Sequence, residues 1–211
     1  MDTELQDITR HIERHIGPVG TVFHEAVSDD LHIDVHHVAS SLFRRREVLV
    51  TSGMSARPMA VPSQSREPRF AEVLVVLPKG WPLSKADFSD ERNYWPIRLM
   101  KRLARYPHHA NTWLGFGHTL AHGEAKQATV PYAEGTSLCA AILLPPSSLG
   151  QAAWSFKRAD GQDVFFWAVV PLHLSELEFK LEHGVDPLLE LFDRHGVTDR
   201  IDPARPSVVG P

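Results

Sequence analysis

The fold is decided by residues 70–77, which read Phe-Ala-Glu-Val-Leu-Val-Val-Leu and are apolar at every position except Glu72. A run of this length and composition is typical of a strand that is covered on both faces of a sheet. The run is followed by Pro78 and Gly80, which indicate a turn. We therefore expect the core of this protein to form around an internal strand.

Other strands are expected on both sides of this run. The further segments with strand-like patterns are residues 21–27, 31–38, 47–51, 137–144 and 163–172. Ser28, Asp29 and Asp30 supply a turn between the first two of these segments. Residues 52–69 contain three prolines and little periodicity, which favours an ordered loop.

Helical spacing and capping patterns predict four helices. They are expected over residues 4–16, 95–106 with Pro96 at the first helical position, 176–183 and 187–195. The order of helix, strands, helix, strands, helix and helix lacks the regular alternation of a doubly wound sheet. The sequence therefore predicts an α+β fold in which helices flank a mixed or antiparallel sheet, as one domain over residues 1–211.

The composition limits the classes of partner. Among 211 residues, 26 acidic side chains stand against 22 basic ones, which gives a net charge of −4. This balance excludes the strongly basic footprint of a sequence-independent nucleic-acid binder. The helix predicted over residues 95–106 has a basic face with Arg98, Lys101, Arg102 and Arg105, which we interpret as a solvated surface.

The N-terminus and the cysteine content point to a cytoplasmic protein. Cys139 is the single cysteine, so no intramolecular disulfide and no two-cysteine metal or redox motif can form. The first residues are acidic and lack the basic and apolar regions of a signal peptide. No apolar stretch reaches the length of about 18 residues that a membrane span needs, so we expect no membrane association.

Two patterns resemble sites of nucleophilic catalysis or phosphate binding, and both fail locally. Around Ser55, Arg57 stands where a nucleophile elbow needs a small residue, and Pro58 interrupts the helix that should follow. The segment Gly115 to Gly117 lacks the third glycine, or the Lys-Ser/Thr pair, of a phosphate-binding loop. We therefore expect no catalytic residues, no cofactor and no enzymatic activity.

Metal binding is the most serious chemical alternative. Strand alternation places His32, Asp34 and His36 on one side, with His37 next in the chain. A second group consists of His118 and His122, which flank a short loop rather than share a helix face. Solvated or hydrogen-bonding histidines are the favoured interpretation, so the sequence predicts no metal, and a His-dependent metallohydrolase stays as the less favoured function.

Residues 108–135 have little periodicity but hold many side chains of the types that anchor protein interfaces. The predicted partner-contacting residues are Trp113, Phe116, His118, His122 and Tyr132. For Trp113 and Phe116 the alternative is that each covers the core as a lid. The segment favours protein binding over catalysis.

Six stretches resemble the suppressor-of-fused-like domain family. They are residues 51–55 (Thr-Ser-Gly-Met-Ser), 71–81, 93–104, 112–119, 165–178 and 202–207. Together they occur in order from about residue 20 to 208. A match of that extent is more specific than any one of the motifs.

The resemblance implies a non-enzymatic domain that binds another protein. The eukaryotic relative clamps a transcription-factor peptide as an added strand between two domains, and we expect this chain to be too short for the second. Its peptide-facing region resembles residues 118–135 here, including His118 and His122. Stand-alone bacterial relatives resemble immunity proteins of polymorphic toxin systems. The expected function is therefore an immunity protein that neutralises a cognate toxin, with a general protein-interaction or regulatory module as the alternative.

Overall fold

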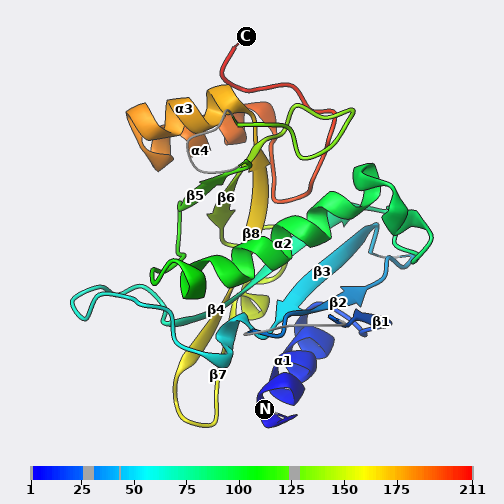
Figure 1. Ribbon diagram of the computed structural model, residues 1–211, viewed down its shortest axis with the longest axis vertical. Coiled ribbons are helices and arrows are strands. Elements are labelled where there is room, and N and C mark those ends of the chain that lie inside the picture. The colour runs from blue at the N-terminus through cyan, green and yellow to red at the C-terminus, as the bar shows by residue number, and fades with distance from the viewer. Residues whose placement is uncertain (1, 26–30, 43, 124–128, 211) are drawn as a thin grey trace.

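Over the residues that are described, a mixed eight-stranded sheet forms the centre of the computed structural model, and four α-helices pack around it (Figure 1). The structure describes residues 2–25, 31–42, 44–123 and 129–210. This arrangement is the predicted α+β fold.

The strands pair in the order β1-β2-β3-β4-β8-β6-β5, and β7 also pairs with β8. Their bounds are β1 Thr21–Phe23, β2 Asp34–Val38, β3 Arg46–Ser52, β4 Phe70–Pro78, β5 Thr119–Ala121, β6 Ala140–Leu144, β7 Ser155–Lys157 and β8 Asp163–Leu172. Only β4 and β8 run parallel among these pairs, so the sheet is mixed. Because β4 lies between β3 and β8, it is the internal strand that its sequence predicts.

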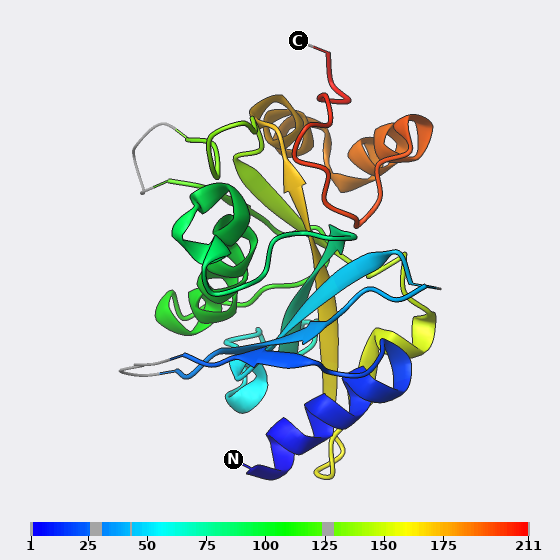
Figure 2. The same ribbon diagram turned by 90° about the vertical axis from the view of Figure 1, so that its right-hand side faces the viewer.

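Helices cover both faces of the sheet (Figure 2). Their bounds are α1 Asp2–His15, α2 Glu91–His109, α3 Leu174–His183 and α4 Val185–His195. On one face, Met100 and Leu103 of α2 pack with Val73 and Val75 of β4. On the other, the core divides between α1, which packs on β3, β4 and β8, and the α3–α4 pair, which packs on β6 and β8. Alternate residues of the central strands are thus buried on opposite faces.

Helix α2 begins earlier than the sequence predicts. Asp90 is its N-cap residue, and the Asp90 carboxylate accepts a hydrogen bond of 2.9 Å from the backbone N–H of Arg92. Pro96 therefore lies inside the helix, and its predicted place at the first helical position is wrong. A capping carboxylate satisfies the free amides of the first turn, which fixes the start of the helix at Glu91.

The basic residues of α2 are not simply solvated, which corrects the sequence-based interpretation. Arg98 donates to the backbone carbonyl of Tyr132 over 3.0 Å, and Arg102 donates to that of Gly123 over 2.9 Å. Arg105 forms an ion pair with Glu25. These arginines attach α2 to two segments, the connection between β5 and β6 and the one between β1 and β2.

The polar residue in the central strand, Glu72, is fully buried beneath the turn that follows β3. Its carboxylate accepts hydrogen bonds from the hydroxyls of Thr51 (2.7 Å) and Ser55 (2.6 Å) and from the backbone amides of Gly53 (3.0 Å) and Ser55 (2.9 Å). Burial raises the pKa of Glu72, and these donors oppose that rise. Ser55 is itself fully buried, so its hydroxyl supports the turn.

Candidate functional site

The strand β5 ends the sheet and is the centre of the segment that the sequence singles out. It pairs with β6 through Thr119 to Ile142, Leu120 to Ala141 and Ala121 to Ala140. In the same register, the N–H of His122 donates to Cys139 and the carbonyl of His118 accepts from Leu143. In an antiparallel ladder such hydrogen-bonded residues alternate with residues whose backbone groups point away. The N–H and C=O groups of Thr119 and Ala121 therefore face outward from the sheet.

Three of the predicted contact residues precede or begin this edge. Phe116 is 41% exposed, and Trp113 is half-buried against the core beneath α2. The Trp113 ring lies 5.6 Å from the ring of His118, which is also half-buried. Phe116 is thus a side chain on the surface, whereas Trp113 partly covers the core.

The other two predicted residues lie after β5. His122 lies with Nδ1 2.9 Å from the carbonyl oxygen of Val130, and its ring centroid lies 4.8 Å from that of Tyr132. Tyr132 is only 3% exposed and stacks on Trp95 at 5.0 Å, so its expected place on the surface is wrong. Burial also raises the pKa of Tyr132. Any effect of Tyr132 on a partner must therefore act through the fold of the segment.

The histidines considered as metal ligands separate into different environments. Nε2 of His36 lies 2.9 Å from the Ser52 hydroxyl, and Nε2 of His37 lies 3.0 Å from the Glu47 carboxylate. His32 and Asp34 do lie together, with Nε2 of His32 2.8 Å from Oδ1 of Asp34.

The third member of that group is His24, which the sequence reasoning missed. It follows β1, whose register pairs Phe23 with Val35 and so sets His24 opposite Asp34. The signal for His24 is the predicted turn at Ser28, Asp29 and Asp30, which itself lies outside the described residues. A turn centred on residue 29 would set residues 24 and 34 opposite each other.

Two serines among the described residues contact histidines, and only in the second pair is the histidine also held by another group, as an oriented base would be. Ser52 and His36 are both 2% exposed, and Nδ1 of His36 has no partner among the described residues. Ser137 lies 3.2 Å from Nδ1 of His173, whose Nε2 contacts the carbonyl of Arg205. The thiol of Cys139 is 4% exposed, and burial raises its pKa, which makes it a poor nucleophile.

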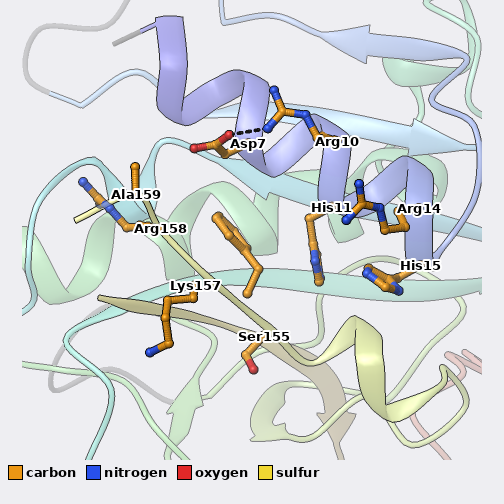
Figure 3. Close-up of a pocket in the computed structure, with 10 residues that line it drawn as sticks. Asp7, Arg10, His11, Arg14, His15, Ser155, Lys157, Arg158 and Ala159 are labelled. Atoms are coloured by element: carbon orange, nitrogen blue, oxygen red, sulfur yellow. Dashed lines mark hydrogen bonds and ion pairs between the residues drawn. The ribbon is translucent and has the colours of Figure 1, made fainter. Parts of the chain in front are cut away.

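A cavity of about 550 Å³ lies between α1 and β7 (Figure 3). Its walls are basic, but Arg10 is paired with Asp7 at 2.7 Å and Lys157 with Asp163 at 3.0 Å. His11 is buried, and loss of hydration lowers its pKa, which keeps the ring neutral at pH 7. Arg14 and Arg158 also line the cavity, so its wall stays basic around a buried histidine.

In the part of the chain that the structure describes, no helix combines the length and the apolar character that crossing a membrane requires.

Comparisons with known proteins agree with the fold. The family model of the suppressor of fused protein matches residues 29–206. A suppressor of fused homologue from Neisseria gonorrhoeae has a crystal structure with a TM-score of 0.69 and 19% identity, over 100% of this chain and 99% of that one. No curated protein matches the chain at a significant level.

Two further crystal structures have a TM-score of 0.65 and 14% identity over 98% of this chain. One is that of the Sufu–Fu complex, in which 92% of the matched chain is covered. The other is that of Drosophila Suppressor of Fused, in which 51% is covered. At these identities the likeness is one of fold.

Proposed function

This chain belongs to the suppressor of fused family, and on that premise we propose that it is a non-enzymatic protein-binding domain that holds a segment of its partner along the outer edge of β5. We take residues 1–211 as one such domain. The crystal structure of the Sufu–Fu complex, which has the same fold, supports a protein as the class of partner.

The observation that carries this proposal is the outward backbone of β5. An exposed edge strand offers unpaired N–H and C=O groups at every second residue, and a second chain can pair with them as an added strand. Thr119 and Ala121 present these groups here. Because main-chain pairing gives little selectivity, side chains beside the edge must choose the partner.

Apolar side chains on both sides of β5 fit that role. Phe116 is 41% exposed and Val130 is 46% exposed, so both side chains can contact a partner that binds beside β5. Nζ of Lys180 on α3 lies 3.5 Å from the hydroxyl of Thr119, and it adds a positive charge beside the edge. The partner segment that fits is extended, with an apolar residue and an acidic one. Trp113, His118 and His122 flank this surface and stay proposed contacts.

The partner that we propose is a cognate toxin, which would make the chain an immunity protein of a polymorphic toxin system in the cytoplasm. The resemblance to stand-alone bacterial members supports this choice, as does the match over 99% of the Neisseria gonorrhoeae homologue. A general regulatory module would use the same edge with a different partner. A metallohydrolase that uses His118 and His122 is less favoured, because among the described residues these two histidines are not part of a group of ligands close enough to share an ion.

The edge is tested by two substitutions at one position. Ala121→Pro removes an outward N–H without removing a hydrogen bond to β6, because proline is tolerated where the N–H faces away from the sheet. Ala121→Ser keeps the N–H and is the matched control. We expect Ala121→Pro to weaken binding by at least about tenfold, whereas Phe116→Ala weakens it by about 1 to 3 kcal/mol. The measurement is calorimetric titration with the protein encoded beside this gene, with a thermal melt of each variant.

The identity of the partner is tested by growth. Cells that express the neighbouring toxic domain should grow when the wild-type chain is co-expressed and should not grow with Ala121→Pro. If the chain binds the toxic domain but does not restore growth, the immunity role is excluded and the general regulatory module remains. Equal binding by folded Ala121→Pro and Ala121→Ser would exclude the β5 edge. Turnover of generic ester or phosphate substrates that is lost on His118→Ala would overturn the non-enzymatic assignment.

A further inference from the structure

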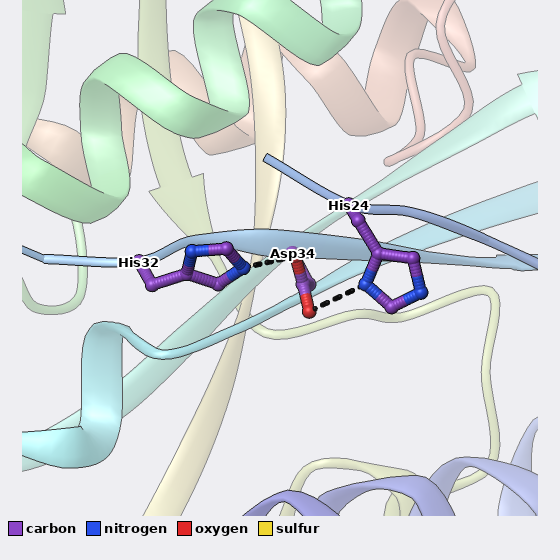
Figure 4. Close-up of side chains that lie close together, drawn as sticks. All are labelled: His24, His32 and Asp34. Atoms are coloured by element: carbon purple, nitrogen blue, oxygen red, sulfur yellow. Dashed lines mark hydrogen bonds and ion pairs between the residues drawn. The ribbon is translucent and has the colours of Figure 1, made fainter. Parts of the chain in front are cut away.

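We propose that His24, His32 and Asp34 form a binding site for a divalent transition-metal ion of the zinc class, at the opposite edge of the sheet from β5. The three side chains converge at the hairpin of β1 and β2, with Asp34 between the two imidazoles (Figure 4). We call this group the hairpin site.

The distances suit an ion that is shared by three ligands. Nδ1 of His24 lies 3.0 Å from Oδ2 of Asp34, and Nε2 of His32 lies 2.8 Å from Oδ1. All three ligand atoms lie within 4.8 Å of one another. Ligands at about 2.0 to 2.2 Å from a zinc ion stand roughly 3 to 3.5 Å apart. An ion therefore needs shifts of a few tenths of an ångström at each carboxylate–imidazole contact, and a larger closure of up to about 1.5 Å between the two imidazoles, which contact different oxygens of Asp34.

Exposure allows these shifts and gives the ion access. The side chains of His24 and His32 are 70% and 51% exposed, so both rings can turn about their side-chain bonds. The Asp34 side chain is 8% exposed and forms the fixed floor of the site. The metal would replace the hydrogen atoms that now join each imidazole to the carboxylate.

The donor set selects the class of metal. Two imidazole nitrogens and one carboxylate oxygen suit zinc and its transition-metal neighbours, whereas magnesium and calcium take oxygen ligands. Three ligands from one chain leave at least one coordination position open to water. The site therefore holds an ion at the surface and differs from the closed four-ligand sites that many small domains need for folding.

The backbone around the ligands is anchored, which is the support that a metal site requires. The N–H of Glu25 donates to Oδ1 of Asp34 over 3.1 Å. The carboxylate of Glu25 in turn accepts from the N–H of Ile33 over 3.2 Å and from Arg105 of α2. The residues that adjoin all three ligands are thus attached to one another and to a helix on the face of the sheet.

Gly53 holds the backbone of the ligand His32 in place from the side of β3. Gly53 has a φ angle of 113°, and a Cβ atom there would lie 2.0 Å from the carbonyl oxygen of His32. Only glycine allows the backbone of His32 to approach so closely. Because Glu72 binds the N–H of Gly53, the position of His32 is determined by the buried core.

The test is a titration of the full-length protein, first freed of metal with a chelator, with zinc chloride and in parallel with magnesium chloride. We expect one zinc ion per chain and no binding of magnesium. His24→Ala and His32→Ala should each weaken zinc binding by about tenfold or more, and the double variant should abolish it. His195→Ala is the matched control, because His195 is an exposed histidine at the end of α4.

A second measurement does not depend on variants. Cobalt added to the wild-type protein should give visible absorption bands of a low-symmetry nitrogen and oxygen site, and zinc should displace them. Absence of zinc binding by the wild-type protein would overturn the proposal, as would wild-type affinity in a folded His24→Ala/His32→Ala variant. Equal loss in His195→Ala would also overturn it, because binding would then not belong to the hairpin site.

Discussion

Arg205 forms a two-point ion pair with Glu176, with both N–O distances equal to 2.6 Å. The Glu176 side chain is fully buried and that of Arg205 is 10% exposed. The carboxylate also accepts from the backbone amides of His173 and Val208, at 2.9 and 3.0 Å. The pair therefore joins the first turn of α3 to the C-terminal segment. Glu176 lies in the motif at residues 165–178, and Arg205 lies in the motif at residues 202–207.

Removal of this charge pair should strongly destabilise the protein. Glu176→Gln leaves the buried guanidinium of Arg205 without its counter-charge, and we expect a loss of about 3 to 5 kcal/mol in the free energy of unfolding. The matched control is Glu190→Gln, because Glu190 and Arg194 form a pair in which both side chains are more than two thirds exposed. That control should cost less than about 1 kcal/mol. Chemical denaturation measures both, and similar losses would contradict the role of burial.

The same pair predicts that the free energy of unfolding depends on pH in the acid range. Burial alone raises the pKa of Glu176, but the hydrogen bonds and charge of Arg205 and the backbone donors outweigh it and lower the pKa below 4.5. As the pH falls, Glu176 takes up its proton in the unfolded chain before it does so in the folded protein. The contribution of the ionised Glu176 to the free energy of unfolding is therefore full above about pH 5, and it is lost as the pH falls through the folded-state pKa. The difference in unfolding free energy between wild type and Glu176→Gln should therefore narrow below about pH 4.5. A difference that is independent of pH would contradict the lowered pKa.

Tyr132 should behave as a core residue. Its hydroxyl is buried without a hydrogen-bond partner among the described residues, so Tyr132→Phe should leave the free energy of unfolding unchanged or raise it by up to about 1 kcal/mol. Tyr132→Ala removes the stacking on Trp95 and should cost about 3 to 5 kcal/mol. Thermal melts of the two variants decide this. A marked loss with Tyr132→Phe would indicate that the hydroxyl has a partner, such as an ordered water.

The elements that the sequence predicts well are those whose patterns are local. The apolar run at residues 70–77 could be assigned to an internal strand because no partner is needed to see that both faces are buried. The start of α2 was misplaced because Pro96 is a strong local signal for a first turn. Asp90 overrides it through a side-chain hydrogen bond that depends on the geometry of the preceding turn. Strand β5 has three residues, too few for a periodic pattern.

The candidate sites depend on contacts between distant residues, and these were harder to predict. Tyr132 has the composition of an interface residue, but α2 supplies Trp95 to stack on it and thereby removes it from the surface. His32 and Asp34 could be placed on one side of a strand by alternation alone. His24 required the register of β1 against β2, which pairs residues ten positions apart.

The order of the strands separates the two proposed sites by the full width of the sheet. Six strand-to-strand steps lie between β1 and β5, which at about 4.8 Å each amount to roughly 29 Å. An extended peptide would need about nine residues to cover that distance. A strand paired along β5 runs beside that edge and does not reach across the sheet, so it leaves the hairpin site at the opposite edge open to its ion.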